Sequence, residues 1–82
     1  MTTKQREELE RQISGVAMSI SGETCPKQRE RGTSKLFFMR SYFHRPNVDL
    51  AKREDMLKDK RLSDQGRGML EGIRAVREIL RQ

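Results

Sequence analysis

The feature that most constrains the fold is an amphipathic segment at residues 63–82. Its apolar side chains recur every three or four positions, which is the spacing of one face of an α-helix. They are Met69, Leu70, Ile73, Val76 and Leu80. The arginines of this segment fall elsewhere around the same helix, so one side is apolar and the other is basic. Such a helix must bury its apolar side against the rest of the chain or against a partner.

Length and composition limit the chain to one small domain, residues 1–82. Its 82 residues are 33% hydrophobic and 37% charged, so we expect a small core and low stability. Binding to a partner would raise that stability. The sequence has no run of about 18 apolar residues, and its first residues lack the apolar centre of a signal peptide. We therefore expect a cytoplasmic protein that does not interact with membranes.

Residues 1–22 are predicted to form the first helix. Thr2 and Gln5 have the spacing of a capping box, in which each side chain bonds to the backbone N–H of the other residue. The predicted apolar stripe consists of Leu9, Ile13, Val16, Ala17 and Ile20.

Residues 23–33 are predicted to form a mobile basic loop. Pro26 and Gly32 interrupt this stretch, and its charges are not accompanied by an apolar stripe. A short helix that begins near Pro26, after a cap at Thr24, is the alternative, because proline suits the first turn of a helix.

Residues 34–45 contain all four aromatic side chains of the protein, Phe37, Phe38, Tyr42 and Phe43. Aromatic residues favour strands, so a short run of this kind is compatible with either a strand or a helix. We predict a helix capped by Ser34, because no second strand is available for pairing. Pro46 should end it.

Residues 47–82 are predicted to form an antiparallel helical hairpin. Asn47 or Asp49 is expected to cap its first helix, and Ser63 its second. The short connection between the two helices favours an antiparallel arrangement. The expected fold is thus all-α, a small bundle of three to four short helices with a basic central loop.

Gly68 and Gly72 lie four residues apart, on the side of the last helix next to its apolar stripe. Without side chains there, the backbone of a neighbouring helix can come close. This spacing therefore predicts tight packing.

The net charge of +6 is concentrated in the middle of the chain. Residues 23–46 have six basic against two acidic side chains, a surplus of four, whereas residues 1–22 are neutral. An anionic partner should therefore contact the central segment first. The predicted partner contacts are Lys27, Arg29, Arg31, Lys35, Arg40 and Arg45, followed by exposed Arg67, Arg74 and Arg77.

The sequence offers little for catalysis. It has one cysteine, Cys25, and one histidine, His44, so neither a disulfide nor a metal cluster is expected. Ser41 lies three residues before His44 and could share a helix face with it, but a structural or exposed His44 is the favoured interpretation. We expect no enzyme activity, no cofactor and no metal.

The aromatic rings of residues 37–43 have two interpretations. Interleaved with lysine and arginine, they could stack on unpaired bases while the cations bind phosphates. In a chain of this size they are also the largest apolar groups, and most of them should lie in the core. The core interpretation is favoured.

The C-terminal third resembles small helical accessory proteins encoded by tailed bacteriophages. The resemblance consists of Arg67-Gly68 followed by apolar residues at helical spacing up to Leu80. It implies a virus-encoded accessory protein, in the host cytoplasm or in the virion, and it implies no catalytic residues.

Together these features predict a non-enzymatic binding protein. The favoured function is stoichiometric docking on a larger protein or nucleoprotein assembly, in virion assembly or in the inhibition of a host machine. The alternative is direct binding of DNA or RNA through the central basic and aromatic segment. A homo-oligomer is left open.

Overall fold

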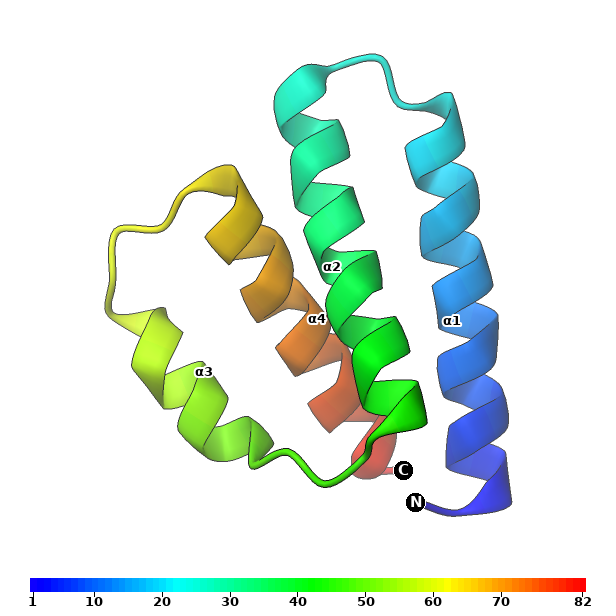
Figure 1. The fold of residues 1–82 in the computed structure, drawn as a ribbon. Helices are drawn as coiled ribbons and strands as arrows, with labels where there is room; N and C mark the ends of the chain where they lie inside the picture. The colour runs from blue at the N-terminus through cyan, green and yellow to red at the C-terminus, as the bar shows by residue number, and fades with distance from the viewer.

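The computed structural model describes residues 1–82 as four helices without strands (Figure 1). They are α1 (Thr3–Gly22), α2 (Pro26–His44), α3 (Leu50–Lys58) and α4 (Asp64–Leu80). α2 lies between α1 and α4, and α3 packs only on α4. The predicted all-α bundle is confirmed, and residues 34–44 are helical rather than extended.

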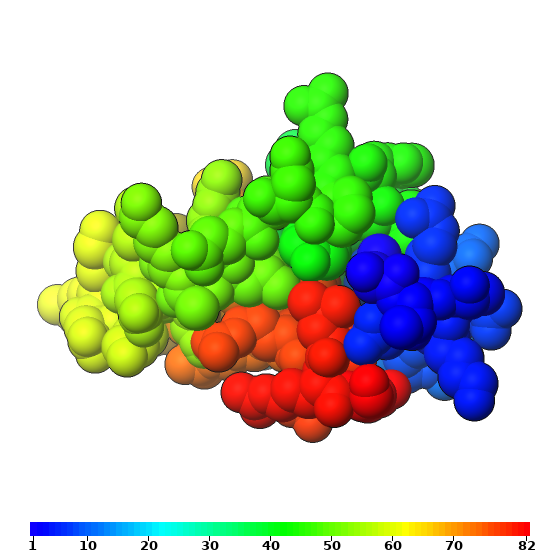
Figure 2. Space-filling model, turned by 90° about the horizontal axis from the view of Figure 1, so that it is seen from below, coloured from blue at the N-terminus to red at the C-terminus, as the bar shows by residue number.

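Gln5 joins the two ends of the chain. It forms the predicted capping box, because its Oε1 accepts the Thr2 N–H at 2.8 Å and its own N–H donates to Thr2 Oγ1 at 3.1 Å. Its Nε2 also donates to the carbonyl oxygen of Leu80, at 3.2 Å. Arg6 lies over the ring of Phe43, 4.3 Å from its centroid, and so connects the start of α1 to the end of α2. Figure 2 shows the N-terminal residues beside the C-terminal ones.

The predicted basic loop at residues 23–33 is wrong, because α2 begins at Pro26 and continues unbroken through the aromatic segment. Pro26 is the first helical residue. A backbone N–H at this position has no partner within the helix, so proline loses no hydrogen bond there. The N-cap is Cys25, whose side chain makes no capping hydrogen bond. Gly32 does not break the helix. It packs on α1, where an added Cβ would lie 2.9 Å from Ile20 Cγ1.

Contacts with α4 stabilise this first half of α2. Ser34, predicted as a cap, is an interior helical residue whose hydroxyl donates to the carbonyl oxygen of Gln65 at 2.6 Å. The guanidinium of Arg31 lies 3.3 Å from the carboxylate of Asp64. These partners are more than thirty residues away in the sequence, so a local pattern could not indicate them.

The core forms mainly between α2 and α4, which make the most extensive helix–helix contact. All four helices contribute to one cluster of eight buried apolar residues. These are Leu9, Phe38, Met39, Tyr42, Leu50, Ile73, Val76 and Ile79. The rings of Phe38 and Tyr42 stack with their centroids 6.5 Å apart.

Gly68 and Gly72 allow α4 to touch the backbone of α2. A Cβ at Gly68 would lie 2.0 Å from the carbonyl oxygen of Arg31, and one at Gly72 would lie 3.1 Å from that of Lys35. The obstructing atoms belong to the backbone and cannot rotate away. Any side chain at Gly68 must therefore push the two helices apart. The close approach predicted from the glycine spacing is confirmed, and its partner is α2.

α3 and α4 run in opposite directions, as the predicted hairpin requires (Figure 1). Asp49 caps α3 by accepting the Lys52 N–H at 3.1 Å, and Ser63 caps α4 by accepting the Gly66 N–H at 3.2 Å. α4, however, contacts α2 more extensively than it contacts α3. The amphipathic C-terminal helix is thus the common support on which α2 and α3 pack.

Gly68→Ala is expected to lower the free energy of unfolding by about 3 kcal/mol, because its methyl group has no room. Gly15→Ala is the control, since this exposed helical glycine has no atom within 4 Å of the added Cβ. It should raise stability by about 1 kcal/mol through helix propensity alone. Urea unfolding followed by circular dichroism measures both, and equal effects of the two substitutions would contradict the close contact.

Candidate functional site

Intramolecular ion pairs neutralise three of the arginines that the sequence predicts as partner contacts. Arg31 lies near two carboxylates of α4, at 3.3 and 3.7 Å. Arg74 and Arg77 of α4 both pair with Glu54 of α3, whose side chain is only 15% exposed. Arg77 is itself half-buried rather than exposed as predicted. These three arginines stabilise the packing on α4 and are not free for a partner.

The other predicted contacts form no ion pair within the chain. They are Lys27, Arg29, Lys35, Arg40, Arg45 and Arg67. All are exposed except Lys35, which is partly buried. Only Arg67 lies outside α2 and its C-cap. Since Glu30 is the one carboxylate of α2, this helix has a positive charge that the fold does not compensate.

Four exposed residues recur at helical spacing along the side of α2 that points away from the core. They are Arg29, Thr33, Phe37 and Arg40, which we call the outer face of α2. Phe37 is 71% exposed, whereas Met39 on the opposite side of the helix is fully buried. A phenylalanine so exposed contributes little to the packing of this chain.

The aromatic residues divide unequally between core and surface. Phe38 and Tyr42 are buried, and Phe43 is half-buried against the core. The prediction that most of the rings lie in the core is confirmed by these three, and Phe37 is the exception. A single exposed ring remains, so the surface lacks the succession of rings on which several unpaired bases could stack.

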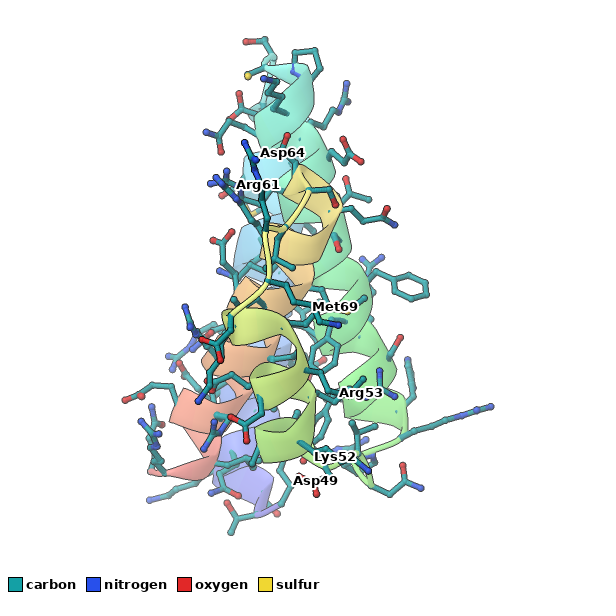
Figure 3. All side chains as sticks on the ribbon, turned by 90° about the vertical axis from the view of Figure 1, so that its left-hand side faces the viewer. Asp49, Lys52, Arg53, Arg61, Asp64 and Met69 are labelled. Carbon is teal, nitrogen blue, oxygen red and sulfur yellow. The ribbon has the colours of Figure 1, made fainter.

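A groove of about 630 Å³ lies between the outer face of α2 and the first turns of α4. α2 contributes Pro26, Arg29 and Phe37 to its lining, and α4 contributes Gln65 and Met69. Figure 3 shows Met69 on the edge of α4 that lies next to α2. This α2/α4 groove has an apolar wall and an unpaired cation, and its volume is in the range of binding pockets.

A second groove, of about 370 Å³, lies on the other side of α2, against α1. Side chains of both charges line it, with Arg31 and Lys35 opposed by Glu23 and Glu71. Arg31 already pairs with Glu71, so its charge is compensated within the chain, whereas Arg29 of the α2/α4 groove has no ion-pair partner. The α2/α4 groove is the better candidate site.

The one histidine lies at the C-terminal end of α2, outside both grooves. His44 packs edge-on against Phe43, with ring centroids 5.5 Å apart. Nowhere do three or more His, Cys, Asp or Glu side chains come together to hold a metal ion. None of the four helices is both long and apolar enough to span a bilayer. Asp55 raises the pKa of Lys58 through a hydrogen bond and its negative charge, but Lys58 lines neither groove.

Of the residues that line the α2/α4 groove, sequence reasoning named only Arg29 as a partner contact, and it missed both residues from α4, Gln65 and Met69. Apolar periodicity indicates Met69 as a core residue, and it does pack on the core, but it also lines the groove. Gln65 has no signal in the sequence, because its position beside α2 results from tertiary packing. Lys52 and Arg53 are further unpaired cations, and they project from α3 on the side of α2 (Figure 3).

Comparison of the chain with protein-family models, with curated proteins and with solved structures gives no match.

Glu54→Gln is expected to lower the free energy of unfolding by about 1 kcal/mol, because two arginines lose their shared carboxylate. The difference from the wild type should shrink in about 1 M NaCl, which screens the pairing. Asp55→Asn is the matched control on the same helix. Its carboxylate is largely exposed and pairs only with Lys58, so the urea midpoint should stay unchanged. If Glu54→Gln does not change the urea midpoint, the Glu54 ion pairs do not stabilise the packing of α3.

Proposed function

We propose that this protein is a non-enzymatic docking protein that binds an acidic surface of a larger protein or nucleoprotein assembly through the outer face of α2. The observation that supports this most is the coincidence of Phe37 with Arg29 and Arg40 on one exposed helix face. Aromatic and arginine side chains provide much of the binding energy at protein interfaces. Here they are free to do so, because no residue of the chain pairs with them.

Charge gives the interaction its orientation. The cations of α2 lie on an element with a single carboxylate, and the fold leaves all but one of them unpaired. Opposite charge on the partner would steer the encounter and select the face that docks. The binding energy itself would come mainly from burial of Phe37 and from arginine pairs that lose water on binding.

The resemblance of the C-terminal third to phage accessory proteins supports a viral origin. We place the protein in virion assembly or in the inhibition of a host machine on that basis. The helix with this resemblance, α4, buries its apolar side against α2, α1 and α3. In this proposal it is therefore the support of the docking face and not the face itself.

Direct binding of DNA or RNA is the second candidate. It is favoured by the stretch from Gly32 to Val48, which contains Lys35, Arg40 and Arg45 and no carboxylate. Arginine and lysine along such a stretch could neutralise successive phosphates. The single exposed ring makes this candidate the weaker one.

The docking function is tested by capture of partners on the tagged protein from cells that express the gene, infected cells if the gene is viral. Phe37→Ser should reduce the recovered assembly about tenfold, and the Arg29→Gln/Arg40→Gln double variant should do the same. The control double variant Lys4→Gln/Lys60→Gln removes two unpaired, exposed lysines elsewhere and should not change recovery. An assembly recovered equally by all variants would contradict the proposal.

Nucleic-acid binding is tested with a generic labelled oligonucleotide at low salt. Docking on protein predicts no shift, or a weak shift that Phe37→Ser does not alter. A strong shift, lost steeply with added salt and abolished by Arg29→Ala/Arg40→Ala/Arg45→Ala, would favour the second candidate.

A further inference from the structure

We infer that the α2/α4 groove binds an acidic amphipathic helix of the partner, whose apolar side chains pack against Phe37 and Met69 and whose carboxylates pair with Arg29 and Arg40. This inference rests on the proposed docking function and adds the site and the chemistry of the ligand. The juxtaposition that supports it is an apolar wall made by two helices, next to arginines that have no partner in the chain.

The shape of the groove suits a helix. Its lining follows α2 from Pro26 to Phe37, a length of about 16 Å, which is three turns of helix. Thr33 and Ser34 line it between these ends, and their small side chains allow close approach of the ligand. A helix laid between two packed helices would present residues i, i+4 and i+7 to the groove, as in other helix-in-groove complexes.

The charges of the groove require a mixed ligand rather than a continuous polyanion. Arg29 lines it, and Arg40 lies on the same face of α2, three residues beyond Phe37. Glu30 also belongs to the lining, and its carboxylate would repel a phosphate backbone that ran along the groove. An amphipathic peptide avoids this repulsion, because its acidic side chains can lie near the arginines and away from Glu30.

The same features argue against single-stranded nucleic acid as the occupant. Base stacking along a strand needs successive exposed rings, and the other three aromatic rings of α2 are buried or half-buried. Met69 adds apolar surface, which suits a leucine or phenylalanine side chain better than a phosphate. The groove therefore favours a peptide.

A library of random 15-residue peptides displayed on yeast, selected on the whole wild-type protein, tests the inference. We expect enrichment of peptides with net negative charge and with apolar residues at helical spacing. Enrichment of basic or neutral peptides, or of none, would overturn it. If single-stranded DNA displaces the selected peptides, and if DNA binding weakens more steeply with added salt than peptide binding does, the groove would be assigned to nucleic acid instead.

Gln65 allows the site to be mapped without disturbing the fold. Gln65→Glu places a carboxylate in the groove, and the first turn of α4 tolerates it because the helix dipole favours negative charge there. The selected peptides should bind this variant about threefold to fivefold more weakly, and Gln65→Lys more tightly by a similar factor. Gln28→Glu is the matched control. It changes the charge equally, in the first turn of α2, but lines the groove against α1. Equal weakening by both glutamates would overturn the assignment to the α2/α4 groove.

The two proposals can fail separately. Failure of the peptide selection, while capture of the assembly still depends on Phe37 and Arg40, rejects the acidic helix but retains docking through the outer face of α2. If substitution of Phe37, Arg29 and Arg40 does not change the amount of assembly captured, the docking function itself is rejected. Thermal unfolding of each variant verifies that the protein remains folded in every comparison.

Discussion

The close contact between α4 and α2 determines which side of α2 faces the solvent. At Gly68 and Gly72 the backbones of the two helices approach so closely that a single methyl group at Gly68 would collide with the carbonyl oxygen of Arg31. Such a contact fixes the rotation of α2 about its own axis, because protein interiors pack too densely to allow sliding. With Arg31 and Lys35 held toward α4, Phe38 and Met39 enter the core. Phe37 and its flanking arginines remain outside.

The same packing decides which cations are available to a partner. Carboxylates on α3 and α4 pair with Arg31, Arg74 and Arg77, so the positive charge around α4 is largely neutralised within the fold. The exposed cations of α2 receive no such partners. Net charge alone could not distinguish these two groups, since both consist of cations on helices. The distinction arises because Glu54, Asp64 and Glu71 come close to their partners only after folding.

The elements that depend on local patterns were predictable from the sequence. The Thr2–Gln5 capping box and the caps at Asp49 and Ser63 have signals within a few residues, and all are present. The predicted apolar stripe of α4 is present in part, because Ile73 and Val76 are buried as expected but Ile79 belongs to the core and Leu70 does not. The start of α2 was not predictable in this way, because Ser34 and Arg31 find their partners on α4, more than thirty residues away. The exposure of Phe37 and the α2/α4 groove likewise follow from the rotation of α2, which no local pattern indicates. Of the candidate site, the sequence therefore predicts the unpaired cations of α2 but not the groove or its α4 side.

Nuclear Overhauser contacts in solution test the central claim most directly, because they report which protons lie within about 5 Å of one another. The contact between α2 and α4 predicts cross-peaks from the Hα protons of Gly68 to the Hβ protons of Ser34, and from those of Gly72 to the side chain of Phe38. It also predicts that the ring protons of Phe37 show no cross-peaks to α1 or to the buried residues of α4. Absence of the Gly68–Ser34 cross-peaks, or contacts of the Phe37 ring with Ile73 or Val76, would contradict the account.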